Sequence, residues 1–147
     1  MINHINKNNK PNMVNISKKN KTIRTAKAEG IIQFSKKTFK KINSFKTKKG
    51  ELNNIAIIAG ILGSKKTSDL IPLCHNISLE DIKIDIQSLD KKSVFKVICT
   101  VKTTEKTGVE MEALTGVAVT CLTIYDMTKS IDKNIIIEKI KLIKKTG

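Results

Sequence analysis

Asp126 and Lys129 have residue types and a spacing that could perform acid–base chemistry. They stand near the end of an apolar stretch, residues 109–131, whose pattern predicts a long helix buried on several sides, partly by another subunit. Residues three apart share one helix face, so the carboxylate and the ammonium can pair. An ion pair on a mostly buried helix costs free energy unless it has partners or a purpose. The pair therefore indicates a cleft, with an ordinary surface salt bridge as the alternative.

A glycine loop comes directly before this helix, in the sequence Lys106-Thr107-Gly108-Val109-Glu110-Met111-Glu112. Backbone N–H groups at a helix start can hold an anion, and the helix dipole stabilises carboxylates in the first turn. The segment predicts either a binding site or the ordinary acidic charge of a helix start. Sequence alone leaves both interpretations open.

Leu73-Cys74-His75 follows Pro72, which ends helical continuation and predicts a loop. In this loop His75 is either a histidine with local partners or an acid–base and anion-binding group. A zinc site is not expected, because the Cys–His pair has no second pair at zinc spacing and His4 is the only other histidine.

Lys48-Lys49-Gly50 would, taken by itself, be a solvated lysine loop. Considered with the three places above, it adds lysines to one histidine and three carboxylates. Such a set could hold a phosphate and move protons. Gly60 and Gly63 do not extend this set, because they are three apart inside a helical pattern and favour close helix packing over a phosphate loop.

The elements that must position these residues follow from the hydrophobic pattern. Alternation predicts strands around residues 22–34, 82–86, 95–101 and 135–143, and a short strand is possible at 13–16. Helical spacing predicts helices around 36–45, 51–66 and 109–131, with residues 46–50 as a loop. The order matches an α+β ferredoxin-like split βαβ sandwich with an antiparallel sheet and an extra helix. We expect one domain over residues 1–147, in which residues 1–12 form a mobile arm.

The formal net charge of +15 raises the question of a nucleic-acid partner. Arg24 is the only arginine among the 28 basic residues, whereas readout of base edges relies on arginine forks. We therefore expect no nucleic-acid partner, although a non-catalytic, lysine-rich domain that binds a polyanion is the alternative from another class. The N-terminus lacks the apolar segment of a secretion signal, and no apolar run could cross a bilayer, which predicts a cytoplasmic protein away from membranes.

Several segments together resemble the signature blocks of the cyclic pyranopterin monophosphate synthase family, the molybdenum cofactor biosynthesis protein C family. The blocks occur in the family's order and spacing, and a weaker match extends to His4-Ile5-Asn6, Met13-Val14 and Arg24-x-Ala26. Their sequences are Lys49-Gly50-Glu51, Ala59-Gly60-Ile61, Thr67-x-x-Leu70-Ile71-Pro72-Leu73-Cys74-His75, 106–115 and Leu122-Thr123-Ile124-Tyr125-Asp126-Met127-x-Lys129.

The resemblance implies a lyase that converts 3′,8-cyclo-7,8-dihydroguanosine 5′-triphosphate, made from GTP by a radical enzyme, to cyclic pyranopterin monophosphate and pyrophosphate. It also implies a homohexamer, arranged as a trimer of dimers, with active sites at subunit interfaces. No redox cofactor is implied, and the need for a divalent metal with the triphosphate is left open.

Carried over residue by residue, the resemblance assigns catalysis to Lys49, Asp126 and Lys129, and no residue to a metal. The two lysines would be the acid–base pair, and Asp126 would orient Lys129. A lysine in a dry pocket or beside other cations has a lowered pKa and can serve as a base. The substrate-binding positions are Leu73, Cys74, His75, Glu110, Met111, Glu112, Arg24 and Lys145.

Departures from the family pattern are Glu51, Asn76 and Lys66, which stand where we expect aspartate, proline and arginine. The sequence also ends at Gly147, before a glycine- and lysine-containing tail that the resemblance leads us to expect. A family member that assembles but no longer turns over is thus a further alternative, against which the intact central motifs argue.

Overall fold

The computed structural model describes residues 2–44 and 46–147, with the side chains of residues 44–49 left undescribed. Four strands form one antiparallel sheet in the order β2-β3-β1-β4. Their bounds are Thr22–Gln33 for β1, Asp81–Leu89 for β2, Val94–Glu105 for β3 and Ile136–Thr146 for β4. The long central strands β1 and β3 pair along their whole length, from Thr22 opposite Glu105 to Gln33 opposite Val94.

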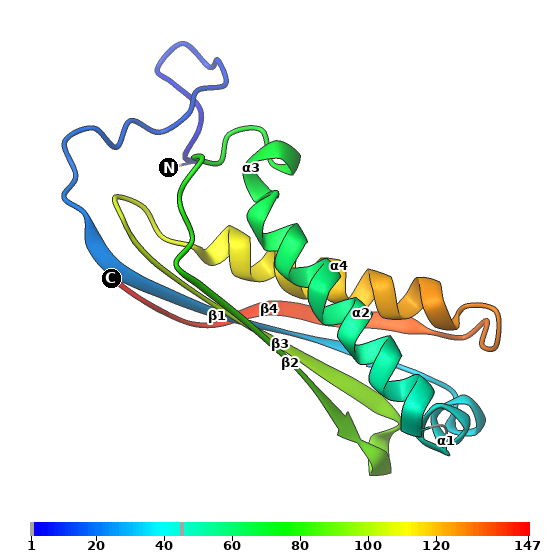
Figure 1. Cartoon of the computed structure of the whole chain (residues 1–147). Coiled ribbons are helices and arrows are strands. Elements are labelled where there is room, and N and C mark those ends of the chain that lie inside the picture. The colour runs from blue at the N-terminus through cyan, green and yellow to red at the C-terminus, as the bar shows by residue number, and fades with distance from the viewer. Residues whose placement is uncertain (1, 45) are drawn as a thin grey trace.

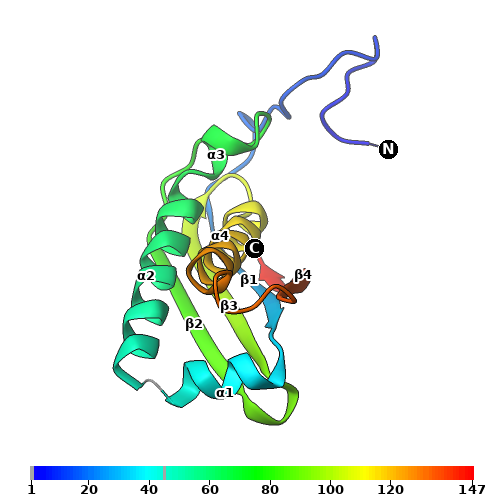
Figure 2. The same ribbon diagram turned by 90° about the vertical axis from the view of Figure 1, so that its right-hand side faces the viewer.

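Helices cover one face of this sheet (Figures 1 and 2). Between β1 and β2 come α1 (Lys36–Ser44), α2 (Lys46–Lys65) and α3 (Thr67–Leu70), and between β3 and β4 comes α4 (Glu110–Thr128). A single turn of 3-10 helix, Asp90–Lys92, closes the hairpin between β2 and β3. Each crossover leaves room for one antiparallel strand between the strands it joins, so the predicted ferredoxin-like split βαβ plan is confirmed.

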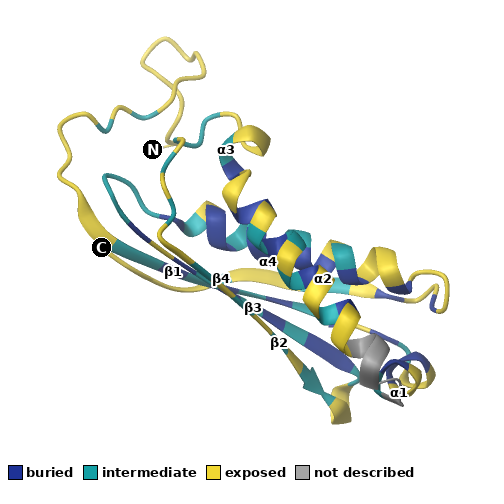
Figure 3. Cartoon of the chain, viewed as in Figure 1, coloured by how far each residue is buried: buried dark blue, intermediate teal, exposed yellow. Residues whose placement is uncertain are grey.

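The core lies between the helices and the sheet, with α4 as its main helical contribution (Figure 3). Ala113, Val117, Cys121 and Ile124 are fully buried, in the spacing that gives a helix one apolar face. The same helix leaves Leu122 58% exposed, so its second apolar face is not covered within one chain.

Helices α2 and α4 pack closely where both carry small residues. A Cβ atom placed on Gly60 would lie 2.9 Å from the carbonyl oxygen of Gly116, and nearer still to the side chain of Thr120. The prediction that Gly60 serves helix packing is therefore confirmed.

Two sequence predictions about secondary structure were wrong. Residues 46–50 were expected to form a loop but make the first turn of α2, because lysine is a good helix former and the helix continues into the buried Leu52 and Ala56. Residues 13–16 form no strand, and both edges of β1, the strand that follows them, are already paired with β3 and β4. The mobility of residues 1–12 stays a prediction.

Candidate functional site

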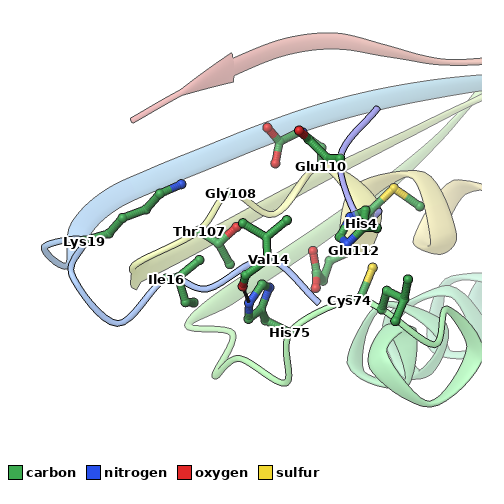
Figure 4. Close-up of a pocket in the computed structure, with 13 residues that line it drawn as sticks. His4, Val14, Ile16, Lys19, Cys74, His75, Thr107, Gly108, Glu110 and Glu112 are labelled. Atoms are coloured by element: carbon green, nitrogen blue, oxygen red, sulfur yellow. Dashed lines mark hydrogen bonds between the residues drawn. The ribbon is translucent and has the colours of Figure 1, made fainter. Parts of the chain in front are cut away.

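A cavity of about 220 Å³ lies where the chain before β1, the loop after α3 and the start of α4 meet (Figure 4). Its lining includes all six residues of the two predicted binding segments. These are Leu73, Cys74, His75, Glu110, Met111 and Glu112. The two segments thus converge although 34 residues lie between them in the sequence.

Glu112 is the most deeply buried charged group of the cavity, with an exposed fraction of 5%. Burial raises the pKa of its carboxyl above the usual value, and the negative charge of Glu110 adds to the effect, although a backbone hydrogen bond opposes it. The buried hydroxyl of Ser64 donates to the Glu112 carbonyl oxygen over 2.9 Å, which fixes the backbone of this turn. Glu112 is therefore suited to hold a proton.

Glu110 behaves differently because cations lie beside it. Burial alone would raise its pKa, but the ammonium of Lys145, 2.8 Å from Oε1, and the charge of Arg24 bring the pKa below the usual value. Two carboxyls in one turn are thus driven in opposite directions, a pattern typical of sites that need one proton donor and one anion.

Arg24 and Lys145 flank the cavity and do not line it among the described residues. The Arg24 guanidinium donates to the carbonyl oxygens of Glu105, 2.9 Å away, and Gly147, 3.0 Å away. It thereby joins the end of β3 to the end of the described chain. Lys145 reaches the site through its ion pair with Glu110.

His75 and Cys74 line the opposite wall. His75 Nε2 lies 2.7 Å from the carbonyl oxygen of Val14, and since a carbonyl only accepts, Nε2 carries the proton. Burial, with the charge of Glu112 as a second cause, raises the pKa of the Cys74 thiol, so this cysteine stays protonated and is a lining group rather than a nucleophile.

The segment before β1 supplies lining that the sequence reasoning did not assign. His4, Val14, Ile16 and Lys19 all line the cavity. The weak family match at His4 and Val14 was the available signal, and nothing in the pattern of residues 1–21 indicated which cavity they would reach.

Asp126 and Lys129 form the predicted ion pair, with Nζ 2.6 Å from Oδ1, but on the surface. Their side chains are 69% and 61% exposed, so within one chain the salt-bridge alternative holds and the cleft does not. The Asp126 carboxylate, through its hydrogen bond and charge, raises the pKa of Lys129. The lowered pKa expected of a lysine base is therefore not produced by one chain at this position.

The predicted catalytic and binding residues lie at opposite ends of the molecule. Glu110 and Lys129 are separated by the length of α4, which at the α-helical rise is about 28 Å. Lys49 belongs to the first turn of α2, toward the end where α4 finishes (Figure 1), while its side chain lies outside the described residues. One chain therefore unites the predicted binding segments and leaves the predicted catalytic residues apart from them.

No cluster of three or more His, Cys, Asp or Glu side chains among the described residues could hold a metal ion. No described helix is long and apolar enough to cross a membrane.

Comparison with known proteins gives consistent matches over the whole chain. Residues 13–147 match the MoaC family. A cyclic pyranopterin monophosphate synthase from Sulfurovum sp. (strain NBC37-1) is 47% identical over 146 residues, which cover 99% of this chain and 93% of the relative. Proteins of the same name from Campylobacter jejuni subsp. doylei and Helicobacter pylori (strain G27) are 48% and 47% identical, covering 99% and 100% of this chain and 93% of each relative.

Proposed function

The chain belongs to the MoaC family, and from this premise we propose that it is a cyclic pyranopterin monophosphate synthase, a lyase of molybdenum cofactor biosynthesis. The proposed reaction converts 3′,8-cyclo-7,8-dihydroguanosine 5′-triphosphate to cyclic pyranopterin monophosphate and pyrophosphate. The observation that carries the proposal is the cavity that unites Leu73-Cys74-His75 with Glu110-Met111-Glu112.

The cavity offers the two kinds of group that this reaction needs. Cations held around a triphosphate position it and stabilise the charge that develops as pyrophosphate leaves. Lys19 lines the cavity, and Arg24 and Lys145 flank it. Protons must move at nitrogen and carbon atoms during the ring rearrangement, and a carboxyl such as Glu112, whose pKa is raised, can donate one.

A complete site on this scheme requires two copies of the chain. The distance of about 28 Å along α4 exceeds the reach of one nucleotide bound in the cavity. We therefore propose that Lys49, Asp126 and Lys129 of one subunit face the cavity of another, within a homohexamer that is a trimer of dimers. The exposed apolar side chains of α2, Ile55, Ile58 and Leu62, support such an interface.

Lys49 and Lys129 would then act as the acid–base pair, with Asp126 orienting Lys129. Placement against a second subunit would surround Lys129 with the cations of that cavity, which lowers a lysine pKa and opposes the effect of Asp126. Functional coupling to the upstream radical GTP cyclase, a cytoplasmic location, and the absence of nucleic-acid and membrane partners stay predictions.

The test couples the purified protein to substrate generated in situ by the radical enzyme and measures pyrophosphate release and the fluorescent oxidised pterin. We expect turnover by the wild type, loss of turnover in Lys49→Ala, and nearly unchanged turnover in Lys48→Ala, which removes the same charge one residue away. Equal tolerance of both substitutions would favour the polyanion-binding alternative. A folded oligomer with no turnover would favour a degenerate member.

A further inference from the structure

Asp132 lies in the loop 129–135 between α4 and β4, and only 7% of the residue is exposed. One carboxylate oxygen accepts a hydrogen bond from the backbone N–H of Ser35 over 2.9 Å, and the other accepts from the N–H of Asn134 over 2.8 Å. The bond from Asn134, followed by those from the start of α1, lowers the pKa of Asp132 despite its burial. A buried, ionised carboxylate thus joins two segments that are 97 residues apart.

Ser35 is the residue at which α1 begins. Its Oγ accepts from the N–H of Thr38 over 3.3 Å and its carbonyl oxygen accepts from the N–H of Phe39 over 2.9 Å. The carboxylate of Asp132 therefore occupies the positive end of α1, where an anion is stabilised by the helix dipole. A second contact runs the other way, since Thr38 Oγ1 donates to the carbonyl oxygen of Ile131 over 3.5 Å.

The loop that Asp132 anchors is continuous with the segment that carries Lys129. The N–H of Lys129 donates to the Tyr125 carbonyl oxygen over 2.8 Å, and the N–H of Ile131 donates to that of Thr128 over 3.0 Å. On the other side, α1 leads into α2, whose first turn contains Lys49. Asp132 thus joins the loop that follows Lys129 to the start of α1, the helix that precedes the one carrying Lys49.

We propose that Asp132 is a positioning residue for the synthase reaction, which fixes the segment of Lys129 against the helix pair that carries Lys49 by accepting hydrogen bonds from Ser35 and Asn134. The inference rests on the proposed function, and it adds a residue that neither the family resemblance nor the chemistry of the cavity assigned. Asp132 lies at the end of the molecule opposite the cavity, so it acts on the placement of the lysines and not on the binding segments.

The experiment compares Asp132→Ala and Asp132→Asn with wild type in the coupled assay, as intact oligomers at 25 °C. Misplacement of a reacting group by about 1 Å can cost on the order of 100-fold in rate, so we expect kcat of Asp132→Ala to fall by about that factor while KM stays within about twofold. Asp132→Asn keeps an oxygen that accepts one of the two backbone N–H bonds and should recover part of the loss. Val97→Ala, which removes fully buried methyl groups from β3, controls for loss of stability alone and should leave kcat unchanged.

A second readout does not depend on turnover. Amide hydrogen exchange should accelerate in Asp132→Ala at residues 35–39 and 129–134, and not in the binding segment 110–112. If the wild type has no activity, the proposed function fails. Amide hydrogen exchange then still shows whether Asp132 holds residues 129–134 against residues 35–39. Wild-type kcat in Asp132→Ala, or equal losses in Asp132→Ala and Val97→Ala, would overturn the proposal.

Discussion

Glu110 and Glu112 stand two residues apart in the first turn of α4, yet their surroundings favour different protonation states. Lys145 and Arg24 lower the pKa of Glu110, whereas burial leaves Glu112 with a raised pKa and the Glu110 charge nearby. The family resemblance assigned both to substrate binding, whereas the glycine loop before two glutamates was by itself equally consistent with the ordinary acidic charge of a helix start. The sequence could not predict the difference, since Lys145, which pairs with Glu110, comes from the far end of the chain and the burial of Glu112 depends on how distant segments fold around the cavity.

Glu112→Gln tests the raised pKa of the Glu112 carboxyl through two measurements, the free energy of unfolding and the turnover rate. A carboxyl whose pKa is higher in the folded state than in the unfolded chain stabilises the fold at acidic pH, and this contribution is lost as pH rises through the folded-state pKa. Glutamine carries no charge to desolvate, so the free energy of unfolding of the variant, relative to wild type, should rise with pH above about 4.3 and then level off.

The turnover rate of Glu112→Gln should fall even though the substitution stabilises the fold at higher pH, because glutamine cannot give up a proton. Loss of a general acid typically costs 10²- to 10⁴-fold, so we expect kcat of Glu112→Gln to fall by about 100-fold or more. Urea unfolding at several pH values and the coupled assay measure the two effects. A stability difference that does not vary with pH would contradict a raised pKa for Glu112. Glu110→Gln is the matched control: because the pKa of Glu110 is lowered in the folded protein, the stability of this variant relative to wild type should fall as pH rises.

At the scale of elements, the alternating and helical patterns predicted the order of strands and helices and hence the fold. The start of α2 was missed because Lys46-Thr47-Lys48-Lys49-Gly50 has no apolar residue to mark a period, and only packing of Leu52 and Ala56 shows that the helix has already begun. The role of the segment before β1 was also not predictable. One of its contacts at the cavity is made by a backbone carbonyl, that of Val14, which accepts from His75 and leaves no trace in a residue pattern, and the weak family match at His4 and Val14 did not indicate a cavity.

Gly60→Ala should destabilise the protein by about 1 to 3 kcal/mol, because the added methyl group must push α2 away from Gly116 and Thr120 of α4. Gly50→Ala is the matched control within the same helix. Apart from its chain neighbours and the backbone of its own helix, no described atom lies within 4 Å of a Cβ at that position, so the exchange should stabilise the helix by about 0.5 to 1 kcal/mol. Urea unfolding measures both, and equal effects of the two substitutions would show that the close crossing of α2 and α4 does not exist.

At the scale of the whole molecule, a single chain keeps the predicted binding cavity apart from the predicted catalytic residues, which the proposed reaction must bring together. The cavity is at one end of α4, and Asp126 with Lys129 is at the other. The family resemblance named both sets, and the structure shows that their distance is set by the length of one helix. No pattern in a single sequence could give this, because the relation between two subunits depends on which exposed faces meet.

Mixing two inactive variants tests the shared site directly. His75→Ala removes a cavity residue and Lys129→Ala removes a residue at the opposite end, so each homohexamer should be inactive. In hexamers reassembled from equal amounts, a site formed by the cavity of a Lys129→Ala chain and the lysines of a His75→Ala chain is intact. Random assembly makes about a quarter of the sites intact, so we expect roughly 25% of wild-type turnover to return.

The control mixture pairs Lys129→Ala with Lys49→Ala, whose substitutions lie toward the same end of the folded molecule (Figure 1). If one subunit supplies both lysines to a site, every site in this mixture lacks one of them and no turnover should return. Native mass spectrometry establishes that subunits have exchanged in both mixtures. Exchange without recovery in the first mixture would contradict a site that combines the cavity of one chain with Lys129 of another.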